Sequence, residues 1–174
     1  VTSNVATLYV TPGPCVSENF ENIPASSVSY LSRSWTGSGG TWTATEARTD
    51  QTITTKAICT DGAGSVKSPT FSNGMGTLNF SYVRGFTGTS ARSIQVWVNG
   101  VQQGSTITVS TTSDVVQNYS IDINISGNVQ LELRTSGAQI KIDNISWTCY
   151  DFCMPTHTIT SFVPTSGPAG TLVT

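Results

Sequence analysis

Charged side chains are scarce in this sequence of 174 residues. Asp, Glu, Lys and Arg together make up 10% of the chain, and the formal net charge is −2. The 8 Lys and Arg residues are scattered along the chain, whereas proteins that bind nucleic acid usually gather theirs into a basic stripe. Ser, Thr, Gly and Asn fill the polar positions instead. We therefore expect no nucleic-acid partner.

Long apolar runs and histidines are also lacking. No stretch of about eighteen consecutive apolar residues occurs, so the sequence predicts no membrane-spanning helix. The only histidine is His157, which lies in an apparent linker, and a Ser-His-Asp triad needs a histidine that is oriented by an acid. We therefore expect no enzyme. No leader peptide precedes Val1, so either a leader has been removed or the chain is a module of a longer protein.

Four cysteines are present: Cys15, Cys59, Cys149 and Cys153. An even number of cysteines in a chain poor in charge and rich in Ser and Thr is typical of a secreted or cell-surface protein with disulfides. The spacing from Cys149 to Cys153 would also suit zinc, but Cys15 and Cys59 have no near partners. Cys15 precedes the first strand of the main domain, and Cys149 and Cys153 follow the last. We predict that Cys15 bonds one of these two, with Cys153 preferred.

The stretch from Ser93 to Ser110 predicts a β-hairpin. Its first strand has the period of two that marks one buried face, with Ile94, Val96 and Val98 alternating with Gln95, Trp97 and Asn99. Asn99 and Gly100 tolerate the positive φ that a type I′ turn demands. Trp97 shares its face with Gln95, opposite the aliphatic residues. The indole therefore stands on the outer surface of a sheet, where it can stack on a sugar, unless a loop covers it, which is the commoner arrangement for a Trp.

Further short strands fill most of the remaining chain. Residues 76–85, 115–125 and 129–134 alternate with a period of two, and 56–60 and 65–71 read as two strands flanking 61–64. No segment shows a convincing period of 3.6. This pattern predicts an all-β fold, an antiparallel β-sandwich. Four N-x-S sequons are expected by chance in so polar a chain, at Asn79, Asn118, Asn124 and Asn144.

The last strand, 139–148, contains a slip in its alternation. Ile140 and Ile142 are in phase with each other, and so are Ile145 and Trp147, but the two pairs are out of phase. One extra residue at 143–144 predicts a β-bulge, a feature that re-aims side chains and often lies beside a site. The alternative is a strand buried on both faces, where alternation is not required.

Several motifs occur together in a fixed order. They are Glu18-Asn19-Phe20-Glu21-Asn22, Trp35-Thr36-Gly37, Trp42-Thr43-Ala44, 47–52 (ARTDQT), 78–82 (LNFSY), 96–100 (VWVNG), 125–129 (ISGNV) and 142–147 (IDNISW). This order resembles a jelly-roll accessory module of large secreted bacterial proteins, similar to galactose-binding-like and carbohydrate-binding jelly rolls. The resemblance covers about residues 17–150 and implies a jelly-roll sandwich. Such modules occur beside nuclease, glycosidase and adhesion domains.

A second resemblance lies in the tail. Residues 159–171 (ITSFVPTSGPAGT) resemble the opening of an IPT/TIG immunoglobulin-like domain. We therefore divide the chain into three parts. Residues 1–14 are the end of a preceding domain or a linker, 15–153 the β-sandwich module, and 154–174 a linker with the first strand of a truncated IPT/TIG-like domain.

Three carboxylates are candidate metal ligands: Glu18, Glu21 and Asp143. The first and last strands of a jelly roll are commonly neighbours, which would bring these side chains together. A carboxylate cluster with little basic counter-charge suits a hard cation such as Ca²⁺ better than acid catalysis. The resemblance supports a structural calcium ion, because related modules often carry one there. The alternative is that Glu18 and Glu21 are solvated and that Asp143 caps a bulge.

Sugar binding requires aromatic faces for stacking and planar polar groups for hydroxyls. The candidates are Trp35, Trp42 and Trp97 for the first, and Arg48, Asp50, Arg84, Arg92, Gln95 and Asn99 for the second. Arg84 and Arg92 would equally suit ion pairs with Asp50 or Glu46. We expect a monomeric, non-catalytic carbohydrate-binding module that targets a secreted multidomain protein to a polysaccharide. The alternative is a structural or adhesive spacer of a cell-surface protein with no small ligand.

Overall fold

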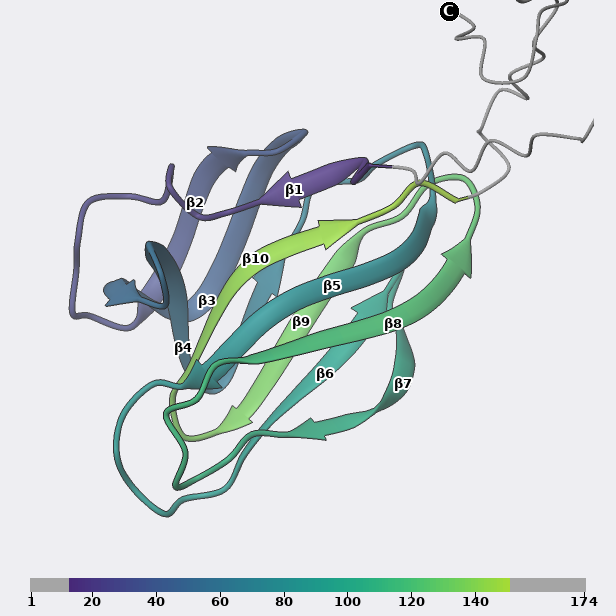
Figure 1. Cartoon of the computed structure of the whole chain (residues 1–174). Coiled ribbons are helices and arrows are strands. Elements are labelled where there is room, and N and C mark those ends of the chain that lie inside the picture. Colours follow the sequence, from purple (N-terminus) through teal and green to yellow (C-terminus); the bar gives the residue numbers. More distant parts are fainter. Residues whose placement is uncertain (1–12, 151–174) are drawn as a thin grey trace, which may run out of the picture.

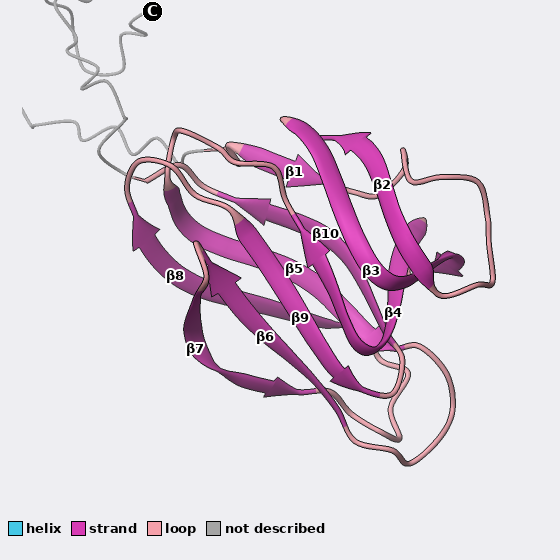
Figure 2. Ribbon diagram, turned by 180° about the vertical axis from the view of Figure 1, so that it is seen from behind, coloured by secondary structure: helices cyan, strands magenta, loops and turns pink. Residues whose placement is uncertain are grey.

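The computed structural model describes residues 13–150, in which every regular element is a strand (Figure 1 and Figure 2). The strands are β1 (Val16–Glu18), β2 (Leu31–Gly37), β3 (Gly40–Thr52), β4 (Lys56–Lys67), β5 (Met75–Arg84), β6 (Arg92–Val98), β7 (Val101–Thr108), β8 (Gln117–Ile125), β9 (Leu131–Gly137) and β10 (Ile140–Trp147). All their pairings are antiparallel. The predicted all-β antiparallel sandwich is confirmed.

The strands form two layers. β8, β5 and β10 pair side by side in one layer, and β7, β6 and β9 in the other, and Figure 1 shows the first layer in front of the second. The long strand β4 belongs to both, because its residues 58–60 pair with β10 and its residues 65–67 pair with β9. β3 accompanies β4, β2 pairs with β3, and β1 pairs with the end of β10. The described residues contain no helix of the length and apolarity that a bilayer crossing requires.

An excursion in β4 accompanies its passage between the layers. Thr45 of β3 pairs with Ser65 and Ala47 pairs with Thr60, so the single residue Glu46 stands opposite residues 61–64. Such extra residues bend a strand and increase its twist. The sequence predicted two separate strands here, at 56–60 and 65–71. That prediction is wrong, because the ladder with β3 resumes beyond the excursion and makes β4 one strand.

The core lies between the two layers and includes three of the four tryptophans, Trp35, Trp42 and Trp147. Ile94, Val96 and Val98 are buried in it, as the alternation of the hairpin predicted. Val98 pairs with Val101, and the turn residues Asn99 and Gly100 have φ values of 51° and 78°. The predicted two-residue turn with positive φ at both positions is confirmed.

The predicted bulge in the last strand is also present. The register between β10 and β5 shifts between Asp143 and Ser146, and Asn144 has a φ of 52°. The aliphatic residues on both sides of the shift are buried in the core. The extra residue therefore lets both halves of β10 turn their apolar side chains inward.

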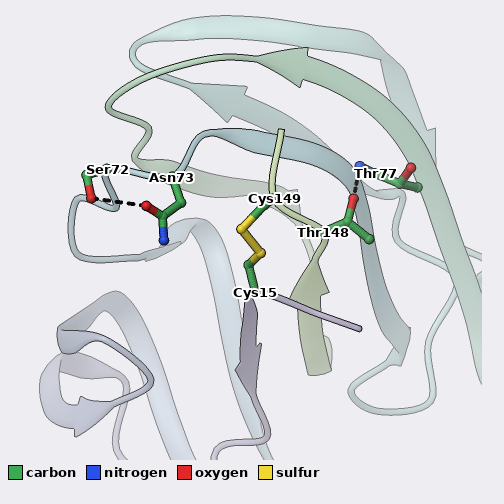
Figure 3. The surroundings of a disulfide bond; sticks show 6 residues. All are labelled: Cys15, Ser72, Asn73, Thr77, Thr148 and Cys149. Atoms are coloured by element: carbon green, nitrogen blue, oxygen red, sulfur yellow. Dashed lines mark hydrogen bonds between the residues drawn. A yellow bond between two sulfur atoms is a disulfide. The ribbon is translucent and has the colours of Figure 1, made fainter. Parts of the chain in front are cut away.

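A disulfide joins Cys15 to Cys149, with 5.3 Å between the Cα atoms (Figure 3). The pairing of β1 with β10 places these residues together, because Val16 stands opposite Trp147 and the Cys15 N–H donates to the Trp147 carbonyl at 2.8 Å. The predicted closure of the module by Cys15 is confirmed, but the preference for Cys153 is wrong. Cys59 is free and buried.

Parts of the predicted organisation fall outside the described residues. These are residues 1–12, Cys153, His157 and the segment 154–174 that resembles an IPT/TIG domain.

Candidate functional site

The outer face of the layer formed by β7, β6, β9 and the end of β4 is polar and carries Trp97. The neighbours of Trp97 along its strand, Val96 and Val98, point into the core, so the indole points away from it, as predicted. The register of these strands places their residues in rows across the sheet. One row, from β7 to β4, is Gln102, Trp97, Glu132 and Lys67. The next row, from β6 to β4, is Gln95, Arg134 and Ser65. We call this surface the Trp97 face.

The indole of Trp97 is partly buried and is held by side chains of its own sheet. Its N–H donates to Oε1 of Gln95 at 3.2 Å, and Nε2 of Gln95 donates to Thr106 at 3.3 Å. The guanidinium carbon of Arg134 lies 3.9 Å from the ring centroid, and Arg134 also donates to Glu132 at 2.8 Å. Because Arg134 keeps much of its side chain in solvent, this cation–π contact contributes about 0.5–1 kcal/mol. The ring therefore has a fixed orientation, and a cation occupies one of its faces.

Trp35 and Trp42 are core residues, which contradicts their prediction as sugar-stacking platforms. They are 5% and 0% exposed. The two residues pair across β2 and β3 with ring centroids 6.5 Å apart, and the Trp42 indole N–H donates to the Ser38 carbonyl at 2.8 Å. Both rings pack between the layers, where no polysaccharide can reach them.

Arg84 and Arg92 are likewise buried, and the prediction that they frame a sugar site is wrong. Arg84 donates to both carboxylate oxygens of Asp114, at 2.6 and 2.8 Å. Within residues 13–150, Arg92 donates only to backbone carbonyls, those of Phe86, Gly88, Ser90 and Gln139. Neither pairs with Asp50 or Glu46, the alternative partners considered from the sequence. Both guanidinium groups instead hold loops in place, the segment before β8 in one case and the segment between β5 and β6 in the other.

Asn99 is also occupied by the fold. Its side-chain amide donates to the Asn128 carbonyl and accepts from the Gln130 N–H, both at 2.8 Å. The amide therefore ties the β6–β7 turn to the connection before β9. One N–H and one lone pair of this exposed amide are therefore used by the fold, and the second N–H and second lone pair are left for the predicted contact with sugar hydroxyls.

Arg48 and Asp50 form a partly buried ion pair on the other layer. Arg48 Nε donates to the Asp50 carboxylate at 2.6 Å, and this hydrogen bond lowers the pKa of Asp50. The guanidinium lies over the rings of Tyr30 and Phe86, at 5.5 and 4.9 Å from their centroids. Arg48 is opposite Cys59 of β4, and Cys59 is in turn opposite Lys141 of β10, so the ion pair lies beside the part of β4 that pairs with β10. The structure therefore does not bring Arg48 and Asp50 together with Trp97.

The thiol of Cys59 lies beneath this ion pair. Burial raises its pKa to about 12, although the charges of Arg48 and Lys141 act in the opposite direction. Because the thiolate is the nucleophilic form, this burial disfavours a nucleophilic role for Cys59 near neutral pH.

The carboxylate of Glu18 is buried and engaged by N–H donors. Oε1 accepts from the Phe20 N–H at 2.9 Å and from the Trp35 indole N–H at 3.4 Å, and Oε2 accepts from the Ser38 N–H at 2.8 Å. The suggestion that Glu18 is solvated is wrong. Both of its oxygens accept hydrogen bonds from N–H donors, so the carboxylate is already stabilised without a metal ion.

Asp143 and Glu21 fit a cation better. Asp143 is fully buried, its Oδ1 accepts from the Asn144 N–H at 2.7 Å, and its Oδ2 has no hydrogen-bond partner among the described residues. Burial raises the pKa of Asp143 to about 6, and the nearby charge of exposed Glu21 adds to this effect. Within residues 13–150, no three His, Cys, Asp or Glu side chains are grouped as a metal site would need. The three predicted calcium ligands are therefore not assembled together.

A groove of about 270 Å³ lies on the outer face of the layer that contains β8, β5 and β10, and the site prediction does not include it. Its lining residues are Asn79, Phe80, Ser81, Asn118, Tyr119, Ser120 and Asn144. The signal that marks it in the sequence is the N-x-S triplet, because asparagines of three of the four predicted sequons line it. When those triplets are interpreted as chance sequons, the sequence does not predict that they share one face of a sheet.

No family model and no curated protein matches this sequence. Among solved structures, the chain is similar to the K3 cleaved adhesin domain of Lys-gingipain from Porphyromonas gingivalis W83, with a TM-score of 0.54 and 12% identity over 78% of this chain and 99% of that one. The chain is also similar to the K1 cleaved adhesin domain of the same protein, with a TM-score of 0.51 and 12% identity over 76% of this chain and 96% of that one. A family 35 carbohydrate-binding module from Clostridium thermocellum has a TM-score of 0.44 and 14% identity over 60% of this chain and 89% of that one. At 12% identity, the likeness to the two adhesin domains shows the fold alone, an all-β sandwich of the jelly-roll type.

Proposed function

We propose that this chain is a non-catalytic binding module of an extracellular protein and that it binds a carbohydrate on the Trp97 face. One observation carries the proposal: the indole of Trp97 lies outside the core, on a polar sheet face, in an orientation held by Gln95 and Arg134. An apolar ring surrounded by hydrogen-bonding groups is the combination that sugar recognition uses. The extracellular location is supported by the Cys15–Cys149 disulfide.

The polar neighbours of the indole supply hydrogen bonds to sugar hydroxyls. Arg134 keeps 41% of its side chain exposed and Glu132 keeps 21%, and both present planar groups beside the ring. Gln102 and Lys67 extend the same row toward the two sides of the sheet. Affinity is modest, because a shallow surface buries little of a ligand and retains water.

A second function is favoured by one feature of the same site. Arg134 already covers one face of the indole. This arrangement is also expected if Arg134 and Trp97 serve only to stabilise the sheet. In that case the domain is a structural or adhesive spacer, and the stack has no ligand. The two functions differ in what removal of the indole does.

The deciding experiment compares polysaccharide binding by the wild type and by Trp97→Ala, in pull-downs with cellulose, xylan, mannan and a β-1,3-glucan. Phe86→Ala serves as the control, because Phe86 is an aromatic of the connection between β5 and β6 that is 37% exposed. Loss of binding in Trp97→Ala alone, with a cooperative unfolding transition and a melting temperature lowered by only a few degrees, supports the carbohydrate module. A wild type that binds none of the polymers overturns it, and unfolding of Trp97→Ala favours the spacer.

We also propose a structural calcium ion at Asp143 and Glu21. The support is the unpartnered, buried Oδ2 of Asp143 and the proximity of the Glu21 charge. Carboxylate oxygens are the ligands that Ca²⁺ prefers, and a bound cation would offset the repulsion between these two groups. In this proposal Glu18 plays no part as a ligand, and calcium stabilises the fold without catalysing a reaction.

A further inference from the structure

Two N-x-S triplets lie on neighbouring strands, Asn79 to Ser81 on β5 and Asn118 to Ser120 on β8. Because side chains alternate along a strand, the Asn and the Ser of each triplet share one face. The middle residues, Phe80 and Tyr119, turn to the opposite, core-facing side, where their ring centroids are 5.4 Å apart. Each triplet therefore presents one amide and one hydroxyl to the outer face of the sheet.

The register between β5 and β8 combines the triplets into a ladder. Asn79 stands opposite Ser120, and Ser81 stands opposite Asn118. In the second pair the Ser81 hydroxyl donates to the Asn118 side-chain carbonyl at 2.8 Å. We call these four residues the Asn/Ser ladder. It is a continuous strip of amides and hydroxyls across two strands.

The bulge of β10 adds a third amide to the strip. Asp143 and Ser146 pair with Ser81 and Asn79, and Asn144 lies in the bulge between them. Its φ of 52° is in the left-handed region, which Asn tolerates better than most residues. Asn144 is exposed and lines the same groove as the ladder. The bulge thus delivers to this face an amide that an unbroken strand would not carry there.

Most of these groups have no partner in the part of the chain that the structure describes. Among the described residues, the side chains of Asn79, Ser120 and Asn144 make no hydrogen bond, and the amide nitrogen of Asn118 is also free. An Asn amide both donates and accepts, which matches the hydroxyls of a sugar ring. None of the described residues that line the groove is charged, whereas anionic ligands are usually held by Arg or Lys. The chemistry therefore selects an uncharged, hydroxyl-rich ligand.

We propose that this groove is a second binding site, which takes a short stretch of a neutral oligosaccharide through the amides of Asn79, Asn118 and Asn144. Its volume of about 270 Å³ is close to the lower end of the usual range for small-molecule sites, about 300 Å³. The site stands on its own contacts and does not rest on the Trp97 face, which belongs to the other layer. A chain with both sites would hold two glycan segments on opposite faces.

Side-chain NMR signals test the two sites separately in one titration. The ¹⁵N-labelled protein is titrated with cellohexaose, xylohexaose, mannohexaose and laminarihexaose, and with oligogalacturonate as the charged counterpart. The amide signals of Asn79, Asn118 and Asn144 report on the groove, and the indole N–H of Trp97 reports on the Trp97 face. We expect saturable shifts of the three Asn signals with at least one neutral oligosaccharide and none with oligogalacturonate.

Two matched variants separate recognition from folding. Asn144→Gly removes the amide and keeps a residue that adopts positive φ freely, and we expect roughly three- to tenfold weaker binding. Asn124→Gly is the control, because Asn124 is also a sequon residue with positive φ (53°) and does not line the groove. It should leave the affinity unchanged, and both variants should keep the wild-type backbone spectrum.

The outcomes distinguish this proposal from the proposed function. Asn shifts without a shift of Trp97 support the groove and count against the Trp97 face. A shift of Trp97 alone overturns the groove and leaves the proposed function standing. Absence of any Asn shift with all four neutral probes, or equal loss of affinity in Asn144→Gly and Asn124→Gly, also overturns the groove.

Discussion

The carboxylate of Glu18 accepts the backbone N–H of Ser38 at 2.8 Å, so the first strand of the module holds the β2–β3 turn from inside the fold. Gly37, the last residue of β2, precedes Ser38 and has no side chain, which leaves the space that this contact needs. A Cβ atom on Gly37 would lie 1.9 Å from Oε2 of Glu18. Glu18 therefore acts as a buried cap for backbone N–H groups.

Glu18→Gln should lower the free energy of unfolding by about 2–3 kcal/mol, because hydrogen bonds to a charged acceptor are replaced by weaker ones and an amide N–H₂ faces other donors. Urea unfolding in EDTA measures this. Glu21→Gln is the matched control, since Glu21 is exposed, and it should change stability by less than about 0.5 kcal/mol. Equal losses in the two variants would show that Glu18 is not the cap described.

Asp143 should make the protein less stable as the pH rises through about 6. Its pKa is raised from 3.8 to about 6, first by burial and second by the charge of Glu21. Because the folded state holds this proton more tightly than the unfolded state, the stabilising contribution is fully present below the unfolded pKa and is lost as the pH rises through the folded pKa. The loss approaches about 3 kcal/mol at full ionisation.

Asp143→Asn should remove this part of the pH dependence. Unfolding by urea from about pH 4 to about pH 8, in EDTA, should show a shallower decline in the variant than in the wild type. The variant should also be more stable than the wild type at the upper end of this range, because it carries no buried charge there. Identical slopes in the two proteins would refute the assignment to Asp143.

Calcium should raise the melting temperature if it binds at Asp143 and Glu21. A ligand that binds the folded state alone stabilises it in proportion to the logarithm of its concentration above Kd. Calorimetric scans at neutral pH with EDTA, Ca²⁺ or Mg²⁺ measure the shift. Asp143→Asn and Glu21→Gln should abolish it, and Glu18→Gln should not. A melting temperature indifferent to EDTA and to added Ca²⁺ would remove the ion from the proposal.

Removal of the Cys15–Cys149 disulfide should cost about 5 kcal/mol in the chain-entropy model, because the bond closes a loop with a sequence separation of 134 residues. Cys149→Ser tests this by thermal unfolding under non-reducing conditions. Cys153→Ser is the control and should leave the stability and the peptide map of the Cys15 bond unchanged. A peptide map that links Cys15 to Cys153 would contradict the connectivity.

The tryptophans should differ in what their removal does. Trp42→Ala should lose about 3–5 kcal/mol, because it leaves a large cavity in the core. Trp97→Ala should lose about 1 kcal/mol, the scale of its cation–π contact with Arg134. Denaturant unfolding of both variants measures the difference. A loss of similar size in the two would mean that Trp97 is a packing residue.

Local pattern was sufficient for the strands and for the direction of their side chains. The alternation from Ile94 to Val98 identified both the core face and the outward position of Trp97, and Asn99-Gly100 identified the turn. The break in phase at Asp143 and Asn144 likewise revealed the bulge. These features depend on the backbone geometry of a few consecutive residues, and a sequence displays that geometry directly.

Local pattern could not tell which outward surfaces stay open or which distant residues meet. Trp35 and Trp42 resembled Trp97 in the sequence, but the layers close over them. Arg84 found its partner Asp114 30 residues along the chain, and Arg92 reaches the Gln139 carbonyl 47 residues away. The choice of Cys149 over Cys153 followed from the register of β1 against β10.

The sequence by itself determined the all-β class, the hairpin, the bulge and the side of the sheet on which Trp97 stands. The tertiary structure alone decided the cysteine partner, the burial of Glu18 and the alignment of two N-x-S triplets into the Asn/Ser ladder. The physical reason is that alternation arises within a single strand. Burial, register and pairing arise between strands, so they depend on how segments far apart in the chain pack together.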